Sequence, residues 1–172
     1  QHWRNEGLDV LQADALQISW EDILKSSSEK ILVSNLPYQI SSSIVIDRSL
    51  DLAPLKGMVL MFQKEVAQRI RAAASTDAYG LLSVIAQNFW DIHMVCEAGP
   101  RDFQPAPKVA SRVLSFSPRK TQIQNRKKFL KFVKAAFAKR RKQLKSNLVS
   151  DPEWQNSSPS LLPQWLELKG KP

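Results

Sequence analysis

The sequence of 172 residues contains only one cysteine, two histidines and five glycines. Because Cys96 has no second cysteine to pair with, an intrachain disulfide is excluded, and so is a metal cluster held by thiolates. His2 and His93 lie far apart, and neither stands in the spacing of a metal-ligand pair. The glycines form no glycine-rich turn. The sequence therefore predicts no metal site.

No apolar run in the sequence is long enough to cross a bilayer, which requires about 20 residues. We recognise no lipidation motif and no secretory signal. Hydrophobic residues make up 43% of the chain, including five Trp and seven Phe, which is typical of a globular protein. These features predict a cytoplasmic protein with one buried core, or with one core and a small lobe.

Acidic residues are missing from one long segment. Residues 103–150 contain no Asp or Glu but fourteen Lys and Arg, whereas the rest of the chain has eleven basic and sixteen acidic residues. The net charge of +9 is therefore concentrated in this segment. Such an asymmetry indicates a polyanionic partner, most simply nucleic acid. An anionic membrane surface is the alternative.

Apolar runs and turn signals predict an alternation of strands and helices. The expected strands cover residues 8–16, 31–34, 57–62, 89–97 and 112–117, and the expected helices 19–24, 41–50, 63–74 and 81–87. Ser41 is the expected cap of the second helix. This order is typical of an α/β protein with a doubly wound sheet, whose last strands are expected to be antiparallel.

A domain boundary is expected near Pro118, which divides the chain into residues 1–118 and 119–172. Beyond it, apolar residues recur with helical spacing from Asn125 to Val149, so the sequence predicts one continuous helix there. The Lys and Arg residues of this segment fall mostly outside the apolar stripe. We expect a small, basic helical lobe after the α/β domain.

The segment Asn35-Leu36-Pro37-Tyr38 follows an apolar strand and is the most informative feature of the sequence. Open α/β sheets place their chemistry at the carboxyl ends of the strands. The Asn35 side-chain oxygen and the Leu36 carbonyl could accept both hydrogens of an exocyclic amine, and Pro37 restricts Leu36 to an extended conformation. Tyr38 could stack on a base. An ordinary strand exit is the structural alternative.

Four segments, in the same order, resemble the KsgA-type ribosomal RNA adenine dimethyltransferases. Residues 35–41 resemble the family's adenine-amine loop, and residues 63–69 with 79–84 resemble its central helix and following loop. Residues 103–111 resemble the loop before the final strand, and residues 137–147 the signature helix of the small lobe. The resemblance implies the carboxyl-terminal part of a Rossmann-like class I methyltransferase sheet plus a small helical lobe.

The resemblance also implies an activity and a site. The enzyme would use S-adenosylmethionine, without a metal, to dimethylate N6 of two adjacent adenines near the 3′ end of small-subunit ribosomal RNA, in step with ribosome biogenesis. Cofactor-binding residues would be Asp14 and Asn35. Catalytic residues would be Asn35, Leu36, Pro37, Tyr38 and Phe103.

The same resemblance implies RNA contacts and a partner. The RNA-binding residues would be Lys108, Arg140, Arg141, Lys142 and Lys145. The partner would be small-subunit ribosomal RNA or the precursor of the small ribosomal subunit, bound by a monomer. For residues 140–142, a solvated helix face is the structural alternative, although no acid in the surrounding segment balances their charge.

Some family features are missing. A glycine-rich strand-to-helix turn, expected to hold the methionine part of the cofactor, is absent, and so is an acid after the next strand for its ribose. We therefore expect the chain to be a carboxyl-terminal portion, inactive by itself, with an incomplete lobe. Three alternatives remain: a non-catalytic RNA-binding assembly factor, a large-subunit RNA dimethyltransferase and a DNA adenine methyltransferase.

Overall fold

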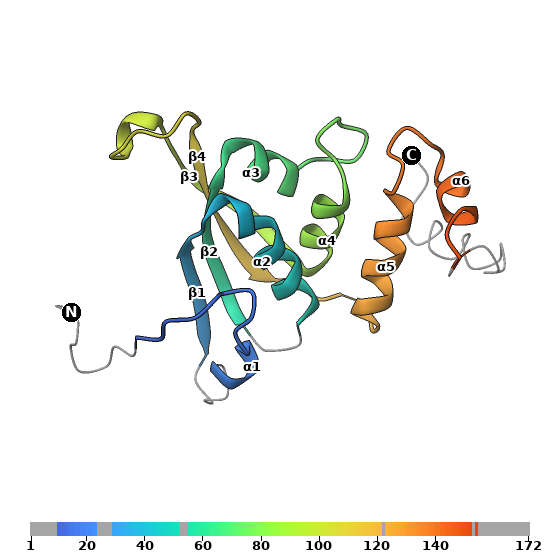
Figure 1. Ribbon diagram of the computed structural model, residues 1–172, viewed down its shortest axis with the longest axis horizontal. Helices are drawn as coiled ribbons and strands as arrows, with labels where there is room; N and C mark the ends of the chain where they lie inside the picture. The colour runs from blue at the N-terminus through green and yellow to red at the C-terminus, as the bar shows by residue number, and fades with distance from the viewer. Residues whose placement is uncertain (1–9, 24–28, 52–54, 122, 153, 155–172) are drawn as a thin grey trace.

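The computed structural model describes residues 10–23, 29–51, 55–121, 123–152 and 154. Strands β1 (Lys30–Asn35), β2 (Leu55–Gln63), β3 (Trp90–Ala98) and β4 (Ser111–Pro118) form one sheet in the order β1-β2-β4-β3 (Figure 1). β1 and β2 are parallel, whereas β4 is antiparallel to both of its neighbours. The predicted antiparallel pairing of the last strands is thus confirmed.

Helices connect the strands and extend beyond the last one. They are α1 (Trp20–Ile23), α2 (Tyr38–Leu50), α3 (Lys64–Ile70), α4 (Leu81–Phe89), the 3₁₀ turn η1 (Pro100–Asp102), α5 (Arg126–Ala136) and α6 (Leu144–Val149). We call residues 119–154 the helical lobe. None of the described helices combines the length and the apolar character needed to cross a membrane.

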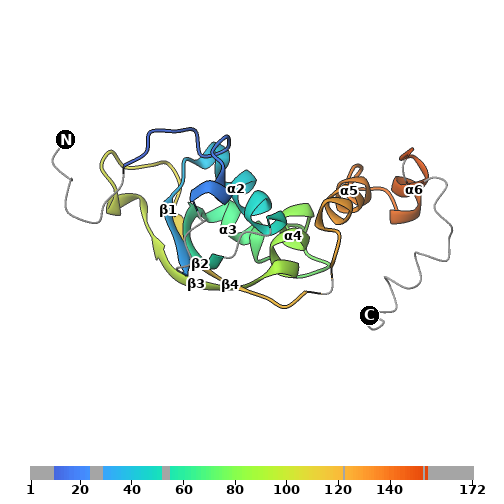
Figure 2. The ribbon, with the colours of Figure 1, turned by 90° about the horizontal axis from the view of Figure 1, so that it is seen from below.

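The helices α2, α3 and α4 lie together on one face of the sheet (Figure 2). A doubly wound sheet has helices on both faces, so this part of the sequence-based prediction is not met within the described residues. The reason lies in the connections: the parallel crossover β1–α2–β2 places its helix on one face, and the later strands join antiparallel. On the other face, Ile31 and Val33 are 58% and 71% exposed.

The core lies between the sheet and these three helices. Leu60 and Phe62 of β2 and Leu114 and Phe116 of β4 are almost completely buried, and the rings of Phe62 and Phe116 pack edge to face at 6.0 Å. Each such side chain contributes roughly 1.5–3 kcal/mol by leaving water. The strongest burial therefore falls on the two central strands, which hold the carboxyl edge of β1 and β2 in place.

The strand predicted for residues 8–16 is wrong where it can be judged. Residues 8 and 9 lie outside the described residues, residues 10–14 have no regular structure, and a turn follows from Ala15. A strand needs a hydrogen-bonded neighbour to be stable. No described strand pairs with this segment, so its apolar residues have no sheet to join.

The second helix begins earlier than predicted. Pro37 is its N-cap residue, with φ −55° and ψ 132°, and the helix starts at Tyr38. Proline favours a helix start because its ring fixes φ and its missing N–H would be unpaired there. Ser41 is therefore no cap: it is fully buried within the helix and its Oγ donates to the Tyr38 carbonyl at 2.9 Å.

The third helix ends at Ile70 rather than at residue 74. The Gln87 side chain of α4 donates from Nε2 to the carbonyls of Ile70 and Ala72, at 2.9 and 2.8 Å. These bonds satisfy carbonyls that a longer helix would use internally. A side chain distant in the sequence thus sets this helix end, and helical periodicity alone does not reveal it.

The single helix predicted from Asn125 to Val149 is also wrong. α5 ends at Ala136, residues 137–143 form turns, and α6 begins at Leu144. The apolar stripe hid the break because residues 137, 144 and 148 keep helical spacing and no glycine or proline interrupts them. Consequently Arg140, Arg141 and Lys142 do not lie on a helix face.

Candidate functional site

The predicted amine loop lies at the carboxyl end of β1. Asn35 is the last residue of the strand and is exposed, whereas Leu36 is 7% exposed and belongs to the core. Among the described residues, none hydrogen-bonds to the Asn35 amide or to the Leu36 carbonyl. The buried Leu36 side chain anchors the backbone here, and the acceptor oxygens of these two consecutive residues have no partner among the described residues.

The loop before β4 reaches the same edge of the sheet. The hydroxyl oxygens of Tyr38 and Ser111 lie 3.4 Å apart, and the Lys64 N–H donates to the Ala110 carbonyl at 2.9 Å. Tyr38 begins α2 and is 39% exposed, whereas Ser111 begins β4 and is fully buried. The segments around residues 35 and 103–111, far apart in the sequence, therefore meet at one edge.

Phe103 and Lys108 lie on this loop. Phe103 follows η1 and is half-buried, and Lys108 is exposed. The Asp102 carboxylate accepts the Gly99 N–H at 2.6 Å, and the Asp102 N–H donates to the Gly99 carbonyl at 3.1 Å. This turn fixes the start of the loop, while Ser111 fixes its end. No hydrogen bond or ring contact between described residues joins Phe103 directly to Asn35 or Tyr38.

A charged cluster lies at the base of the hairpin formed by β3 and β4. The Glu97 carboxylate accepts from Arg112 Nε at 2.7 Å and from Lys64 Nζ at 3.0 Å. These bonds hold the pKa of Glu97 below its usual value, with the larger effect from Arg112 and the next from Lys64. The cluster ties β3, β4 and the start of α3 together at the edge that carries the candidate site.

Asp14 lies in a turn that its own carboxylate organises. Its Oδ1 accepts the Leu16 N–H at 2.9 Å, and its Oδ2 accepts from Gln17 Nε2 at 3.1 Å. Asp14 is exposed, and a carboxylate has about four acceptor positions, so two stay open. No hydrogen bond joins this turn to Asn35 among the described residues. The structure thus does not bring the two predicted cofactor residues into direct contact.

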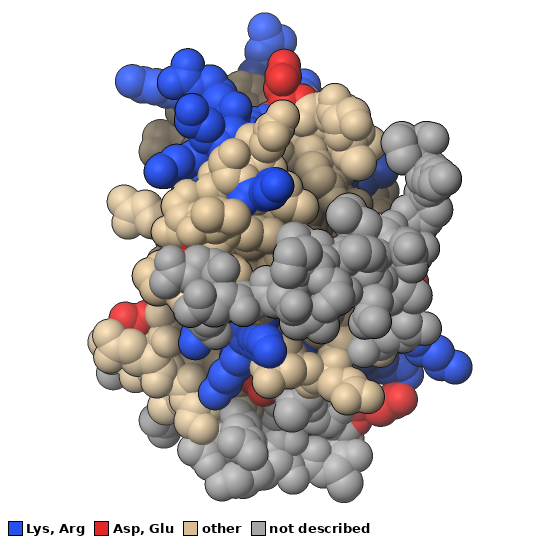
Figure 3. All heavy atoms as spheres, turned by 90° about the vertical axis from the view of Figure 1, so that its right-hand side faces the viewer, with Lys and Arg blue, Asp and Glu red and all other residues tan. Residues whose placement is uncertain are grey.

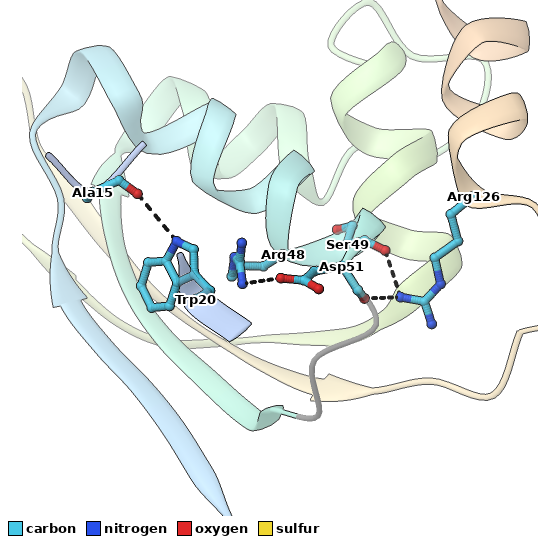
Figure 4. A network of polar contacts seen from close by, with 6 residues as sticks. All are labelled: Ala15, Trp20, Arg48, Ser49, Asp51 and Arg126. Atoms are coloured by element: carbon cyan, nitrogen blue, oxygen red, sulfur yellow. Dashed lines mark hydrogen bonds and ion pairs between the residues drawn. The ribbon is translucent and has the colours of Figure 1, made fainter. Parts of the chain in front are cut away.

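The Asp14 turn is held against α2 through Trp20 (Figure 4). Trp20 Nε1 donates to the Ala15 carbonyl at 3.3 Å, and its ring lies 4.5 Å from the Arg48 guanidinium carbon. Arg48, whose side chain is 7% exposed, pairs with the Asp51 carboxylate at 2.6 Å. A cation over a tryptophan face is stabilising, and more so when water is excluded.

Arg126 joins the helical lobe to the same region (Figure 4). Its Nη1 donates to the backbone carbonyls of Ser49 and Asp51, at the end of α2, and its guanidinium lies 4.9 Å from the Phe89 ring centre. A positive side chain at a helix carboxyl end complements the helix dipole. The lobe is thus bound to the sheet domain by a specific polar contact.

The predicted RNA-binding residues of the lobe gather on one surface. Arg140, Arg141 and Lys142 lie on the turn between α5 and α6, Lys145 lies on α6, and all four are exposed. No described residue forms an ion pair with any of them. Viewed from the lobe side, Lys and Arg side chains cluster at the upper end, at the height of this turn in Figure 1 (Figure 3). Lys108 lies on the separate β3–β4 loop.

Sequence reasoning did not assign roles to several residues that support the site. Glu97, Ser111, Arg126 and Asn147 act through contacts with residues distant in the sequence. Glu97 and Arg112 are paired across β3 and β4, so the strand register would have revealed that ion pair. Ser111 and Asn147 lie in segments that carry the family resemblance, but their contacts depend on how helices and loops pack, as does the contact of Arg126.

The comparisons with known proteins identify the family of the chain. The family model of ribosomal RNA adenine dimethylase matches residues 1–158. A ribosomal RNA small subunit methyltransferase A of Bdellovibrio bacteriovorus is 60% identical over 147 residues, which cover 86% of this chain and 53% of the relative. The protein of that name from Syntrophotalea carbinolica is 43% identical, covering 83% and 54%. The chain thus spans about half the length of these relatives.

Solved structures show the same fold. A dimethyladenosine transferase from Plasmodium falciparum matches with a TM-score of 0.74 and 25% identity, over 97% of this chain and 59% of that one. The 23S rRNA methyltransferase ErmE matches with a TM-score of 0.59 and 21% identity, over 83% and 57%, which supports the fold alone. The predicted class I methyltransferase fold and the family resemblance are both confirmed: the chain belongs to the ribosomal RNA adenine dimethylase family.

Proposed function

We propose that the chain is part of an enzyme that dimethylates N6 of two adjacent adenines near the 3′ end of small-subunit ribosomal RNA. The observation that carries this proposal is the pair of unpartnered acceptors at the end of β1, the exposed Asn35 amide and the Leu36 carbonyl. Family membership supplies the reaction class. The division into a methyltransferase domain, residues 1–118, and a basic lobe, residues 119–172, belongs to the same proposal.

The acceptor pair addresses the difficulty of the reaction. The adenine amine is a poor nucleophile because its lone pair is delocalised into the purine ring. When Asn35 Oδ1 and the Leu36 carbonyl accept its two N–H groups, they favour a pyramidal nitrogen with an available lone pair. The buried Leu36 side chain and Pro37 would hold the acceptors in place before the substrate arrives, so positioning would account for most of the rate enhancement.

Aromatic side chains would hold the base. Tyr38 is partly exposed beside the acceptors, and Phe103 is half-buried on the loop that reaches the same edge. Stacking of a base on an aromatic ring contributes about 1–3 kcal/mol. Each ring could thus offset part of the cost of removing the adenine from its stack.

The cofactor would be S-adenosylmethionine, which supplies an electrophilic methyl group when bound. Asp14 retains open acceptor positions, which would accept the adenine amine of the cofactor, and the exposed Asn35 side chain at the end of β1 would lie between cofactor and target amine. These residues fit part of the cofactor. Among the described residues, no set of three His, Cys, Asp or Glu side chains could hold a metal ion.

The exposed cations of the lobe would bind phosphates of small-subunit ribosomal RNA or of a small-subunit precursor, with the protein acting as a cytoplasmic monomer during ribosome biogenesis. Because Arg140, Arg141, Lys142 and Lys145 form no ion pair with a described residue, their charge is available to a polyanion. The small-subunit names of the curated relatives support this substrate over a large-subunit RNA. Phosphate contacts supply affinity and orientation rather than sequence choice.

The decisive experiment joins the chain to the part of the Bdellovibrio bacteriovorus relative that it does not match. Labelled S-adenosylmethionine is supplied with unmethylated small-subunit particles, large-subunit particles or duplex DNA. We expect transfer of four methyl groups to the small-subunit particles alone, and none by the chain without its added part. Particle binding without measurable cofactor binding would instead support a non-catalytic assembly factor.

A further inference from the structure

The basic turn between α5 and α6, residues 137–143, contains no helix or strand, but hydrogen bonds fix its backbone. It carries Lys139, Arg140, Arg141 and Lys142 within four consecutive positions, all exposed. Four adjacent cations repel one another, so an unsupported segment would spread them apart. The contacts that keep the turn compact therefore decide how these charges are presented.

Asn147 of α6 makes the main contact. It is 4% exposed, and its Nδ2 donates to the carbonyls of Ala136 at 2.7 Å and Lys139 at 3.1 Å. Ala136 is the last residue of α5, so one side chain satisfies a terminal helix carbonyl and fixes the first cationic residue of the turn. Because both contacts are made by Nδ2 to carbonyl oxygens, the orientation of the amide is determined by its partners.

Two further contacts close the turn. The Lys142 N–H donates to the Lys139 carbonyl at 2.9 Å, so this carbonyl accepts both from the last cationic residue of the turn and from the Asn147 side chain. At the start of the turn, the Phe137 ring packs against Tyr79 of the sheet domain, with ring centres 6.2 Å apart. The turn is thus fixed internally and against the body of the protein.

We propose that Asn147 is a positioning residue for RNA binding, which acts by holding the cations of residues 139–142 in one arrangement that contacts several phosphates at once. This rests on the proposed RNA-binding role of the lobe. A preformed backbone avoids the loop-ordering cost that a mobile segment pays on binding. The affinity should therefore depend on an uncharged, buried side chain.

The test uses Asn147→Ala, which changes no charge. RNA affinity of the full chain is measured on a small-subunit ribosomal RNA fragment over a series of salt concentrations. We expect about a tenfold loss of affinity near 0.1 M salt, and a salt slope reduced by about 0.7–0.9, the value for one lost phosphate contact. Asn88→Ala is the matched control, because Asn88 Nδ2 also donates to a backbone carbonyl, that of Val84 at 2.7 Å.

The stability of the lobe must be separated from its RNA binding. Heteronuclear NMR reports whether α5 and α6 remain folded in Asn147→Ala. If they do not, Ala138→Gly replaces it: Ala138 is exposed in the turn, and glycine gives the backbone more conformational freedom without removing a contact of Asn147. We expect the same direction of change in affinity, at a smaller magnitude.

The outcomes are distinct. If the unmodified chain shows no salt-dependent RNA affinity, the proposed RNA-binding role itself fails. If the unmodified chain binds but a folded Asn147→Ala, or Ala138→Gly in its place, keeps the full affinity and salt slope, Asn147 serves only the fold and the inference is overturned. Loss in the folded variant, with Asn88→Ala unchanged, supports it.

Discussion

Tyr38 and Ser111 are in contact, with 3.4 Å between their hydroxyl oxygens, although 73 residues separate them in the sequence. Tyr38 belongs to the loop that would accept the target amine, and Ser111 ends the loop that carries Phe103. Their contact closes the candidate site between two loops. Under the proposed function, this contact would let two separate sequence segments hold one base.

Asn35→Ala tests the acceptor role. Because the Asn35 side chain is exposed and makes no hydrogen bond to a described residue, we expect the free energy of unfolding to change by less than about 0.5 kcal/mol. Methyl transfer by the chimeric enzyme should fall about 100-fold or more, the usual loss when one polar group at a reacting centre is removed.

The control for Asn35→Ala is Gln39→Ala, an exposed amide in the first turn of α2. Methyl transfer and particle binding are measured for both variants, with urea unfolding of each. If Asn35→Ala loses stability and loses particle binding together with methyl transfer, Asn35 is structural. Retained binding with lost transfer supports its place beside the reacting nitrogen.

Much of the sheet domain could be predicted from the sequence, because apolar runs bounded by turn residues determine its strands. The segment from Gly57 to Phe62 is apolar because β2 lies in the middle of the sheet, and its predicted limits differ from the observed ones by at most two residues. The end of β1 at Asn35 follows from the same pattern. Local sequence thus places the candidate acceptors correctly at a strand end.

The remaining differences come from contacts between distant residues. The side chains of Gln87 and Asn147 donate to the last carbonyls of α3 and α5. Neither helix end is marked by a local glycine or proline. The Asp14 segment reads as a strand, yet it has no strand beside it among the described residues. In each case the missing information is a partner, which periodicity in a single sequence cannot supply.

Replacing Arg140, Arg141 and Lys142 together with Ala tests the basic turn. Each lost phosphate contact should reduce the salt slope of RNA affinity by about 0.7–0.9, so a fall of about two is expected for three neighbouring cations. The control removes the same charge elsewhere, at Lys30, Lys56 and Arg71. An equal change of slope in both variants would mean that overall charge, rather than this turn, binds the RNA.

Glu97→Gln tests the charged cluster through its pH dependence. The pKa of Glu97 is lowered by hydrogen bonds from Arg112 and then Lys64, so the folded state favours the carboxylate. A lowered folded pKa gives stability that is present above the unfolded pKa, near 4.5, and is lost as the pH falls through the folded pKa. The variant should therefore be less stable than the original chain at pH 7.

This difference should shrink as the pH falls below about 4.5, because the original carboxylate becomes protonated and resembles glutamine. Urea midpoints at low salt, from pH 7 to pH 3, measure it. Glu65→Gln is the control, since Glu65 is exposed and has no ion pair among the described residues. A constant difference at every pH would show that Glu97 contributes through packing rather than charge.

The pair of Arg48 and Asp51 should respond unequally to removal of either partner. The Arg48 side chain is 7% exposed and its Nε has no hydrogen-bond partner, whereas the Asp51 side chain is 29% exposed. Asp51→Ala leaves a buried guanidinium without its hydrogen-bonded carboxylate, with the Trp20 ring and the charge of Asp47 beside it, and we expect a cost of about 3 kcal/mol. Arg48→Met should cost less, because a thioether can pack against Trp20 without a charge partner and Asp51 can reach water.

Urea unfolding of both single variants and of the double variant at pH 7 measures this asymmetry. In the double variant the unpaired guanidinium is gone, so its cost should be close to that of Arg48→Met alone and well below the sum of the two single changes. Additive costs would mean that the two side chains contribute independently. A tolerated Asp51→Ala, within about 0.5 kcal/mol, would show that water reaches Arg48 and that the Trp20 contact does not depend on the pair.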